Sequence, residues 1–300
     1  MYNDLFSIGP LTFHTYGLMT AIGIISAYLM AESRAKKKRL SEAKIGKIFG
    51  LVIACIIFGY LCSKLLYIAT VLPQLMDGRM SLLDGIANGW VVFGGLIGGI
   101  FGGVVYCRWQ KESFWEYADL AIPAVALAQG FGRIGCFFAG CCYGAHTTSS
   151  WFFTEFSHSL YAPNHVKLVP TQLIMSAGDF LICFGLLLYE KKKQKYRGEL
   201  IAIYLVVYSI GRFIVEFFRG DLIRGQVGAL STSQFIGLFT VTVGFVLWYY
   251  LTTKVKEEVT AVSLDAEQES EGEAAVDPDP VDLKKTDARA ESNAAEKEQV

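Results

Sequence analysis

Seven apolar segments of membrane-spanning length constrain this chain more than any other feature of its sequence. They lie near residues 15–33, 46–70, 90–107, 117–140, 172–189, 199–217 and 234–252. Crossing the ~30 Å hydrocarbon core of a bilayer takes roughly 20 helical residues, and a backbone in lipid must satisfy its hydrogen bonds within its own segment. The sequence therefore predicts an all-α, polytopic membrane protein with about seven transmembrane helices.

The charged residues are few and unevenly placed. They make up 18% of the chain, whose net charge is −1, against about 25% in soluble domains. Residues 254–300 hold 14 acidic and 6 basic side chains, a net of −8, so residues 1–253 carry +7. A basic, apolar body is typical of a membrane protein with cationic cytoplasmic loops. We expect membrane lipid as a partner, no nucleic acid and no cofactor.

Basic clusters indicate the orientation. Four of them follow odd-numbered apolar segments: Arg34–Arg39, Arg108 with Lys111, Lys191–Arg197, and Lys254 with Lys256. Seven spans place all four on one side of the membrane, and Lys and Arg favour the cytoplasmic side. The N-terminus is therefore expected outside and the C-terminus in the cytoplasm. No cleavable signal peptide is evident, because Met1–Thr12 lacks a basic region.

The distribution of apolar and charged residues divides the chain into a membrane domain and a tail. Residues 1–253 form the expected membrane domain, in which the aromatic and polar segment 141–171 makes a small extracytoplasmic cap. Residues 254–300 form an acidic cytoplasmic tail. From residue 257 the tail is rich in Glu, Asp, Ala and Pro without an apolar period, so we predict disorder there.

Ionisable side chains inside the apolar segments indicate a functional site, because burying them in a membrane is costly. Arg133 lies near the end of the fourth segment, and Arg212, Glu216 and Arg219 belong to the sixth. Arg212 and Glu216 are four residues apart and share a helix face. One carboxylate neutralises one of three guanidiniums, and the planar fork of arginine suits phosphate. An anionic ligand is favoured over an internal network that pins the helices together.

Other polar or small residues have structural explanations beside functional ones. His14 with Tyr16 is typical of an aromatic belt at the membrane interface. Asp119 is either a carboxylate at a helix N-terminus or the partner of an arginine, and Gln172 is a cap or a hydrogen-bonding group. Gly94 and Gly95 begin a series of small pairs that favour close helix packing, although they also let a lipid headgroup approach the backbone.

Three of the seven cysteines lie close together in the sequence. Cys136, Cys141 and Cys142 have the spacing C-x₄-C-C, with His146 nearby, whereas zinc sites favour C-x₂₋₄-C pairs with a second pair or histidines elsewhere. Packing as small apolar side chains is favoured, a disulfide is the next interpretation, and no metal site is expected.

Five motifs in order resemble the prolipoprotein diacylglyceryl transferase family over roughly residues 8–250. They are IGPLTFHTYGLM at 8–19, FGGLIGG at 93–99, GRIGCFFAGCCYG at 132–144, PTQL at 170–173, and Tyr208 followed by GRFIVEFFRGD at 211–221. Each is weak alone, and the third is the strongest. Members of this family move the diacylglyceryl group of phosphatidylglycerol to the lipobox cysteine thiol of a preprolipoprotein, and glycerol phosphate leaves. The resemblance implies this transferase activity, these two substrates and a bacterial cytoplasmic (inner) membrane location.

The resemblance also implies roles for residues of this chain. Arg133 and Arg212 would handle the phosphate, and Tyr208 would hydrogen-bond the headgroup, so these three are the expected catalytic residues. Glu216 would orient Arg212 and Arg219. The expected substrate-binding residues are His14, Tyr16, Gly94, Gly95, Asp119, Gln172, Glu216 and Arg219.

The chain departs from the family pattern at several polar positions. Phe93 stands where the family often has a histidine associated with activity, and phenylalanine can neither accept a thiol proton nor donate to phosphate. Cys136 and Cys141 replace the signature asparagine and glutamate, and Ile174–Met175 replaces a tyrosine–glutamate pair.

These departures leave two questions open. His14, Tyr16 and His146 are all candidates for a replacement base. The alternative to the transferase is a catalytically altered or inactive paralogue that binds phospholipid or uses another acceptor. A transporter is disfavoured, because no inverted repeat or paired broken helices are apparent.

Overall fold

The computed structural model describes residues 4–8, 11–87, 89–194, 196–221, 226–228 and 230–274. Within these ranges the chain is mainly helical. The helices are α1 (Thr15–Lys37), α2 (Glu42–Met76), α3 (Leu82–Ala87), α4 (Val92–Trp109), α5 (Phe114–Ala139), α6 (Thr171–Lys192), α7 (Glu199–Glu216) and α8 (Thr232–Ala274). Three antiparallel two-stranded ribbons pair β1 (Asp4–Ile8) with β2 (Leu11–His14), β3 (Thr154–Glu155) with β4 (Lys167–Leu168), and β5 (Gln226–Val227) with β6 (Leu230–Ser231).

Each of the seven apolar segments lies mainly in a helix, and five of these helices are long and apolar enough to cross a membrane. They are α2, α4, α5, α6 and the Thr232–Thr253 part of α8. Helix α7 falls outside this group because Glu199, Arg212 and Glu216 lie within its 18 residues. The predicted all-α, multi-pass membrane protein is confirmed at this level, while the count of seven spans stays a prediction.

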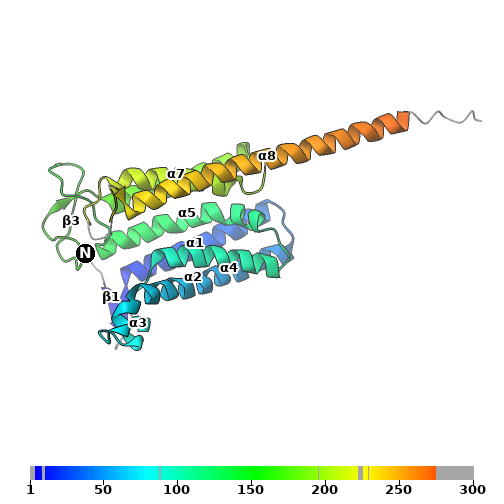
Figure 1. Ribbon diagram of the computed structural model, residues 1–300. Helices are drawn as coiled ribbons and strands as arrows, with labels where there is room; N and C mark the ends of the chain where they lie inside the picture. Colours follow the sequence, from blue (N-terminus) through cyan, green and yellow to red (C-terminus); the bar gives the residue numbers. More distant parts are fainter. Residues whose placement is uncertain are drawn as a thin grey trace, which may run out of the picture. The chain divides into compact units, whose positions relative to one another are not determined.

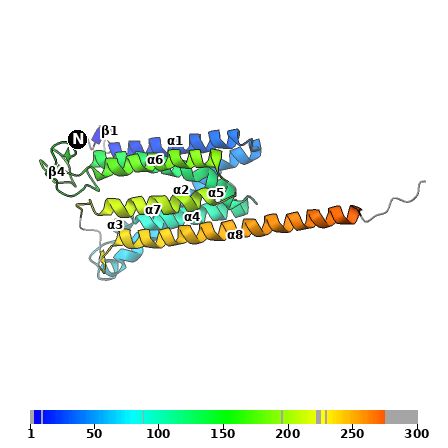
Figure 2. The ribbon, with the colours of Figure 1, turned by 90° about the horizontal axis from the view of Figure 1, so that it is seen from above.

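Most of the bundle consists of antiparallel neighbours. Helix α2 lies beside α4, α1 beside α5, α5 beside α6 and α6 beside α7 (Figures 1 and 2). Helix α8 packs along α7, where the hydroxyls of Ser209 and Thr240 are 2.6 Å apart. One buried apolar cluster joins α1, α2, α4 and α5, and a second joins α5, α6 and α7. Helix α5 therefore lies at the centre of the described bundle.

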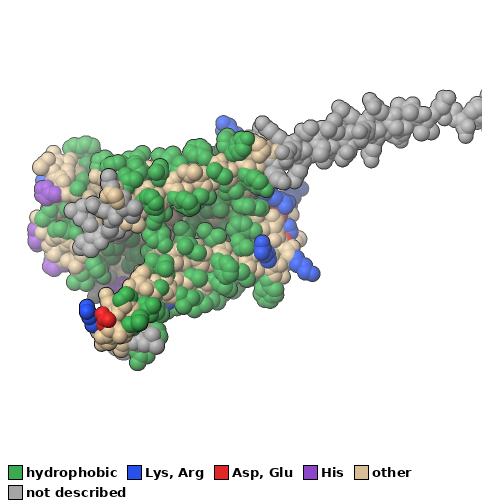
Figure 3. Space-filling model, viewed as in Figure 1, with side chains coloured by type: hydrophobic (Ala, Val, Ile, Leu, Met, Phe, Trp, Pro, Cys, Tyr) green, Lys and Arg blue, Asp and Glu red, His purple; other side chains and the backbone are tan. Residues whose placement is uncertain are grey.

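The two ends of the bundle differ in charge. At one end, Lys44 of α2 pairs with Glu116 in the first turn of α5 at 3.2 Å, and Lys47 pairs with Glu112 in the loop before α5 at 2.7 Å. Arg34 of α1 pairs there with Glu190 of α6 at 2.7 Å. Figure 3 shows apolar side chains over the middle of one face, with the visible Lys and Arg mostly at this end. The opposite end carries the β1–β2 ribbon, α3 and the segment between α5 and α6.

The chain divides into two units, Met1–Leu251 and Thr252–Val300. Helix α8 continues to Ala274, so residues 257–274 are helical where the sequence predicts disorder. Ala and Glu are strong helix formers, and extension of an existing helix avoids the unfavourable nucleation step. Residues 275–300 of the predicted tail lie outside the described residues.

Candidate functional site

A cluster of polar side chains lies inside the bundle near the C-terminal end of α5. The guanidinium of Arg133 hydrogen-bonds the hydroxyl of Tyr208 on α7. The ring of Tyr208 stacks on that of Tyr204 one turn earlier, with the centroids 5.4 Å apart, and the hydroxyl of Tyr204 hydrogen-bonds Gln129 of α5. Because each partner fixes the next, this network holds Arg133 in one orientation.

A second guanidinium enters the same region from α7. Arg212 donates to Glu216, one turn further along α7, and to the hydroxyl of Ser233 on α8 at 3.0 Å. The Arg212 and Glu216 side chains are 11% and 9% exposed. The positive charges of Arg219 and Arg133 both act on Arg212. Guanidiniums from α5 and α7 therefore converge, as the sequence predicts for its fourth and sixth apolar segments.

Arg219 has a carboxylate of its own. Its Nε and a terminal nitrogen donate to the two carboxylate oxygens of Asp221 at 2.8 and 2.6 Å. Glu216 lies 3.8 Å from Arg219 and accepts mainly from Arg212. The sequence-based role of Glu216 as the orienting group of both arginines thus applies chiefly to Arg212. Asp221 neutralises Arg219, so the excess positive charge rests on the other two guanidiniums.

Backbone pairing locks the end of α7 against the chain that leaves α5. The amide of Ala145 donates to Phe218 at 2.8 Å, and the amide of Gly220 donates to Tyr143 at 3.2 Å. A Cβ on Gly144 would collide with the backbone of Val169 and Phe218, so a side chain there would prevent this approach. The pairing brings Cys142 within hydrogen-bonding reach of Arg219.

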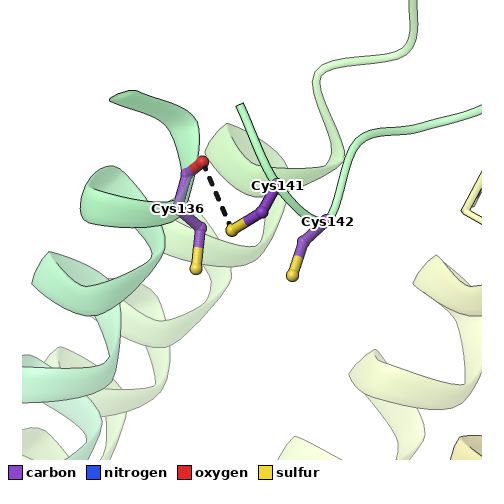
Figure 4. A group of neighbouring side chains, drawn as sticks. All are labelled: Cys136, Cys141 and Cys142. Carbon is purple, nitrogen blue, oxygen red and sulfur yellow. Dashed lines mark hydrogen bonds between the residues drawn. The ribbon is translucent and has the colours of Figure 1, made fainter. Parts of the chain in front are cut away.

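The chain turns sharply after α5. Gly140 has a φ of 71°, and the amides of Gly140 and Cys141 donate to Phe137 and Cys136 at 3.1 and 3.2 Å. This pair of bonds is the Schellman pattern, which sets the sixth residue against the first. It brings the sulfur of Cys141 to 3.8 Å from the carbonyl oxygen of Cys136 (Figure 4).

Tyr16 approaches the same turn from the start of α1. A Cβ on Gly135 would lie 3.2 Å from the Tyr16 ring and 3.3 Å from its carbonyl oxygen. The charges of Arg133, Cys136 and Cys141 all act on the Tyr16 hydroxyl. The side chain is 47% exposed, so it borders the polar cluster without being enclosed by it.

One face of α5 next to the cluster is uncovered. Val125 is 41% exposed although it lies in the middle of the central helix. Gly132, two turns further along and next to Arg133, has open space where a Cβ would stand. Figure 3 shows a hollow across this face of the bundle, between α7 and α8 on one side and α2 and α4 on the other. The part of α5 that precedes Arg133 in the sequence therefore has an uncovered face.

Comparison with known proteins identifies the family. Residues 3–250 match the family model described as prolipoprotein diacylglyceryl transferase. A phosphatidylglycerol–prolipoprotein diacylglyceryl transferase of Clostridium tetani is 44% identical over 240 residues, which cover 80% of this chain and 94% of that protein. The chain belongs to the prolipoprotein diacylglyceryl transferase family. Proteins with the same descriptive name from Clostridium perfringens and Clostridioides difficile are 42% and 32% identical, over 83% and 82% of this chain.

Family membership does not assign roles to individual residues of this chain, so their positions in the structure are compared with the predicted site. Arg133, Tyr208, Arg212, Glu216 and Arg219 lie together, as the motifs predict. Sequence reasoning did not single out Gln129, Tyr204, Asp179 and Asp221. Asp179 is 2% exposed on α6, and the charge of Arg133 acts on it. An acidic residue in an apolar segment was the available signal for Asp179.

Asp119 lies apart from this cluster. It precedes Arg133 by 14 positions in α5, which at 1.5 Å per residue is about 21 Å along the helix. Its carboxylate accepts from the amides of Gly198 and Leu200 at 2.6 and 3.1 Å, and from Gln194 at 2.7 Å. Asp119 caps the N-terminus of α7, so its place among the expected substrate-binding residues has no support in the geometry.

Gly94 and Gly95 serve the contact between α2 and α4. A Cβ on Gly94 would lie 2.5 Å from the carbonyl oxygen of Cys62 and 2.8 Å from Ser63. A Cβ on Gly95 would meet the carbonyl oxygen of Gly59 at an ordinary 3.7 Å. Gly94 is buried against α2, so packing explains this glycine, while the expected contact of Gly94 and Gly95 with substrate stays a prediction.

The remaining candidates lie at the starts of helices or in the segment after α5. Gln172 is 1% exposed and donates to the carbonyl of Cys141 at 2.9 Å, so it supports the turn after α5. His14 is exposed at the N-cap of α1, and His146 is exposed in the segment after α5. Phe93, in the first turn of α4, is 38% exposed. Of the three candidate bases, Tyr16 is the one shown to interact with Arg133.

Proposed function

We propose that this protein transfers the diacylglyceryl group of phosphatidylglycerol to the lipobox cysteine thiol of a preprolipoprotein. The observation that carries the proposal is the convergence of Arg133 and Arg212 inside the bundle of a chain that belongs to this family. Glu216 and Asp221 form ion pairs with Arg212 and Arg219, whereas Arg133 hydrogen-bonds Tyr208 and acts on Asp179 through its charge. The remaining charge suits the phosphate of an anionic lipid.

The reaction is a displacement at carbon. The acceptor thiolate attacks the glyceryl carbon next to the phosphate, a carbon–sulfur bond forms, and the carbon–oxygen bond to phosphate breaks. Glycerol phosphate leaves with the electron pair, and the proton of the thiol passes to solvent or to the leaving phosphate. Negative charge grows on the departing oxygen, and fixed guanidiniums in a site of low dielectric stabilise it.

The contacts suggest a role for each side chain. Arg133 and Arg212 bind the phosphate, Tyr208 fixes Arg133, and Glu216 fixes Arg212. Tyr16 borders the same cluster and offers its hydroxyl as a further hydrogen-bond donor. A cysteine thiol has a pKa near 8.5 and ionises in part near neutral pH, so transfer proceeds without the histidine that Phe93 replaces.

An apolar crevice beside Arg212 suits an acyl chain of the lipid donor. It has a volume of about 190 Å³ and lies between α7 and α8, lined by Ser209, Ile210, Phe213, Ile214, Gly237, Leu238 and Val241. Ile210, Phe213 and Ile214 lie within two residues of Arg212, so the crevice is formed by the same part of α7 that carries Arg212. An amphipathic ligand with a phosphate head matches this arrangement.

The proposed membrane arrangement has seven spans. It adds α1 and α7 to the five apolar helices, because the charges of α7 are satisfied inside the bundle: Glu199 is 3% exposed and accepts from Tyr189 at 2.6 Å. Positive residues gather at the end that holds Lys44 and Lys47, which is therefore cytoplasmic. The N-terminus is then outside, in a bacterial cytoplasmic membrane. Residues 1–253 form the transferase domain, with 141–171 as its extracytoplasmic cap.

A reconstituted assay tests the proposal. Purified protein is incubated with phosphatidylglycerol vesicles and a lipobox peptide, and the thioether product is measured by mass spectrometry. Arg133→Ala and Arg212→Ala are each expected to lower turnover at least about 100-fold, the loss typical of removing one transition-state donor. Arg108→Ala is the matched control, because Arg108 is exposed in the last turn of α4.

Three outcomes separate the possibilities. Near-native turnover in both variants would show that the two arginines are not the phosphate clamp. Binding of phosphatidylglycerol without any product in the unaltered protein would favour the catalytically altered paralogue. Equal loss of activity in the Arg108 control would indicate a general effect of surface charge.

A further inference from the structure

The geometry points to a site for one thiophilic metal ion, such as Zn²⁺ or Cu⁺, formed by Cys136, Cys141 and Cys142. The proposed transfer reaction requires no such ion, so this inference goes beyond that function. It rests on the arrangement of the three sulfur atoms, on the backbone that imposes it and on the positive charge beside it.

The three sulfur atoms lie within 4.8 Å of one another. Zinc–thiolate bonds of about 2.3 Å place the sulfurs around one ion about 4 Å apart. Shifts of about 1 Å or less would therefore bring the three ligands to coordinating positions. A disulfide would use two sulfurs at about 2.05 Å and leave the third unused, so the mutual convergence of all three favours a metal ion.

Two backbone reversals place these sulfurs. Gly140 closes α5 and returns Cys141 to Cys136, and Cys142 then has a φ of 60°. A residue other than glycine in this left-handed region is strained and persists where its surroundings hold it, often at functional sites. Figure 4 shows the sulfurs of Cys136 and Cys142 pointing to the same side of the turn, with the sulfur of Cys141 between them.

Neighbouring elements hold the turn in place. Gln172 donates to the carbonyl of Cys141 at 2.9 Å, and the hydroxyl of Thr171 donates to the carbonyl of Cys142 at 3.0 Å. Both donors belong to the first turn of α6. The ligand atoms are therefore organised before an ion binds, which lowers the entropic cost of coordination. Cys141 and Cys142 are partly exposed, so an ion can reach the site.

The surroundings also suit the charge of the complex. A divalent ion that binds three thiols releases three protons and leaves a complex of net charge −1. Arg133 acts electrostatically on Cys136 and Cys142, and Arg219 hydrogen-bonds Cys142. The positive charges of these guanidiniums stabilise the anionic complex once it has formed. Thiolates select soft or borderline ions over Mg²⁺ or Ca²⁺.

Metal titration of the full-length, reduced protein in detergent tests the inference. Zn²⁺ is added in competition with a chromophoric chelator, and Cu⁺ with a copper(I) chelator in a separate experiment, so that the two ions are distinguished. We expect one equivalent of at least one ion to bind. In weakly buffered solution, Zn²⁺ binding should release up to three protons.

Cys142→Gly is the most informative variant, because glycine adopts a positive φ readily and removes only the thiol. Its affinity should fall more than about 100-fold, exceeding the loss typical of a second-shell change. Cys141→Ser provides an independent test should Cys142→Gly fold poorly. Cys55→Ala, which removes a thiol of α2 instead, is the matched control and should bind as the unaltered protein does.

The inference is overturned if the unaltered protein binds neither ion after full reduction, or if both ligand variants bind as tightly as the control. Binding without any proton release would likewise exclude three thiols as the ligands. All these measurements concern binding, so their failure leaves the proposed transfer reaction untouched. Failure of the transfer assay would equally leave the metal site to be judged by titration.

Discussion

Single ionisable residues in the apolar helices divide into two kinds. Arg133 and Arg212 lie close enough for their positive charges to act on each other, whereas the carboxylate of Asp119 accepts hydrogen bonds from amides at the N-terminus of α7. Sequence position alone does not separate them, because all three are charged groups within predicted spans. The separation comes from the partners, which belong to other helices and are distant in the sequence.

Asp119→Ala should lower stability and leave catalysis in the folded fraction nearly unchanged. The substitution removes the acceptor of the buried amides of Gly198 and Leu200. Unsatisfied buried donors cost about 1–3 kcal/mol each, so the free energy of unfolding should fall by about 2–4 kcal/mol. Denaturant unfolding in detergent measures this loss. Asp119→Asn keeps one acceptor oxygen and should lose less.

A different result for Asp119→Ala would contradict this prediction. Unchanged stability together with lost transfer would return Asp119 to the site, as the sequence motifs originally implied. Turnover is therefore measured per folded molecule, with Arg133→Ala as the reference for a true site residue.

The motifs predict the site residues that carry net charge better than those that support them. Arg133, Arg212 and Glu216 stand out because charge is rare in an apolar segment. Gln129 and Tyr204 do not, since a lone glutamine or tyrosine in a helix is unremarkable until its partner across the bundle is known. Asp221 follows the last predicted residue of its segment, and its pairing with Arg219 depends on the turn after α7.

The apolar segments of the sequence correctly predict that the long helices exist and in which order they follow one another along the chain. Each predicted segment lies mainly in a helix, and the bounds differ by several residues where polar turns extend a helix beyond its apolar part, as in α2. Helix α3 has six residues, too few for a period to be recognised. The β1–β2 ribbon and the residues of β5 and β6 gave no signal, because strands this short lack a repeating alternation.

The contact between α2 and α4 should tolerate a methyl group at Gly95 and not at Gly94. An alanine Cβ at Gly94 would meet the Cys62 carbonyl at 2.5 Å, whereas one at Gly95 would lie 3.7 Å from Gly59. Overpacking costs about 1–3 kcal/mol. Thermal unfolding of Gly94→Ala should therefore show a lower Tm, with Gly95→Ala as the matched control. The opposite order would favour a substrate contact at these glycines.

An ion pair between the α4–α5 loop and α2 should make a pH-dependent contribution to the stability of the fold. Lys47 donates to Glu112 at 2.7 Å, and this hydrogen bond lowers the pKa of the Glu112 carboxyl below its ordinary value of 4.5. A pKa that is lower in the folded state stabilises the fold above pH of about 4.5, and this contribution is lost as the pH falls through the folded pKa.

Glu112→Gln removes the titrating group and isolates its effect. The variant should be less stable than the unaltered protein at neutral pH, and the two should converge as the solution is acidified below pH of about 4.5. Added salt should narrow the difference at neutral pH, because both side chains are partly exposed. A difference that persists unchanged at low pH would contradict the ion pair as its source.

For the whole molecule, the decisive question is which part of the chain the transfer reaction needs. Every residue of the proposed site and its crevice lies between Tyr16 and Val241, inside the unit Met1–Leu251. The acidic residues after Lys256 would repel an anionic membrane surface. Deletion of residues 257–300 should therefore leave turnover with phosphatidylglycerol vesicles unchanged, as measured in the same peptide assay.

The deletion is chosen to keep Lys254 and Lys256, because basic residues after a span help to set its orientation. A second truncation that begins at Lys254 tests this point, since it should lower correct insertion without changing turnover per inserted molecule. Protease accessibility in right-side-out vesicles measures the insertion. A large loss of turnover in the first, well-inserted truncation would show that the acidic segment contributes to the reaction, and the domain division at residue 253 would then have to move toward the C-terminus.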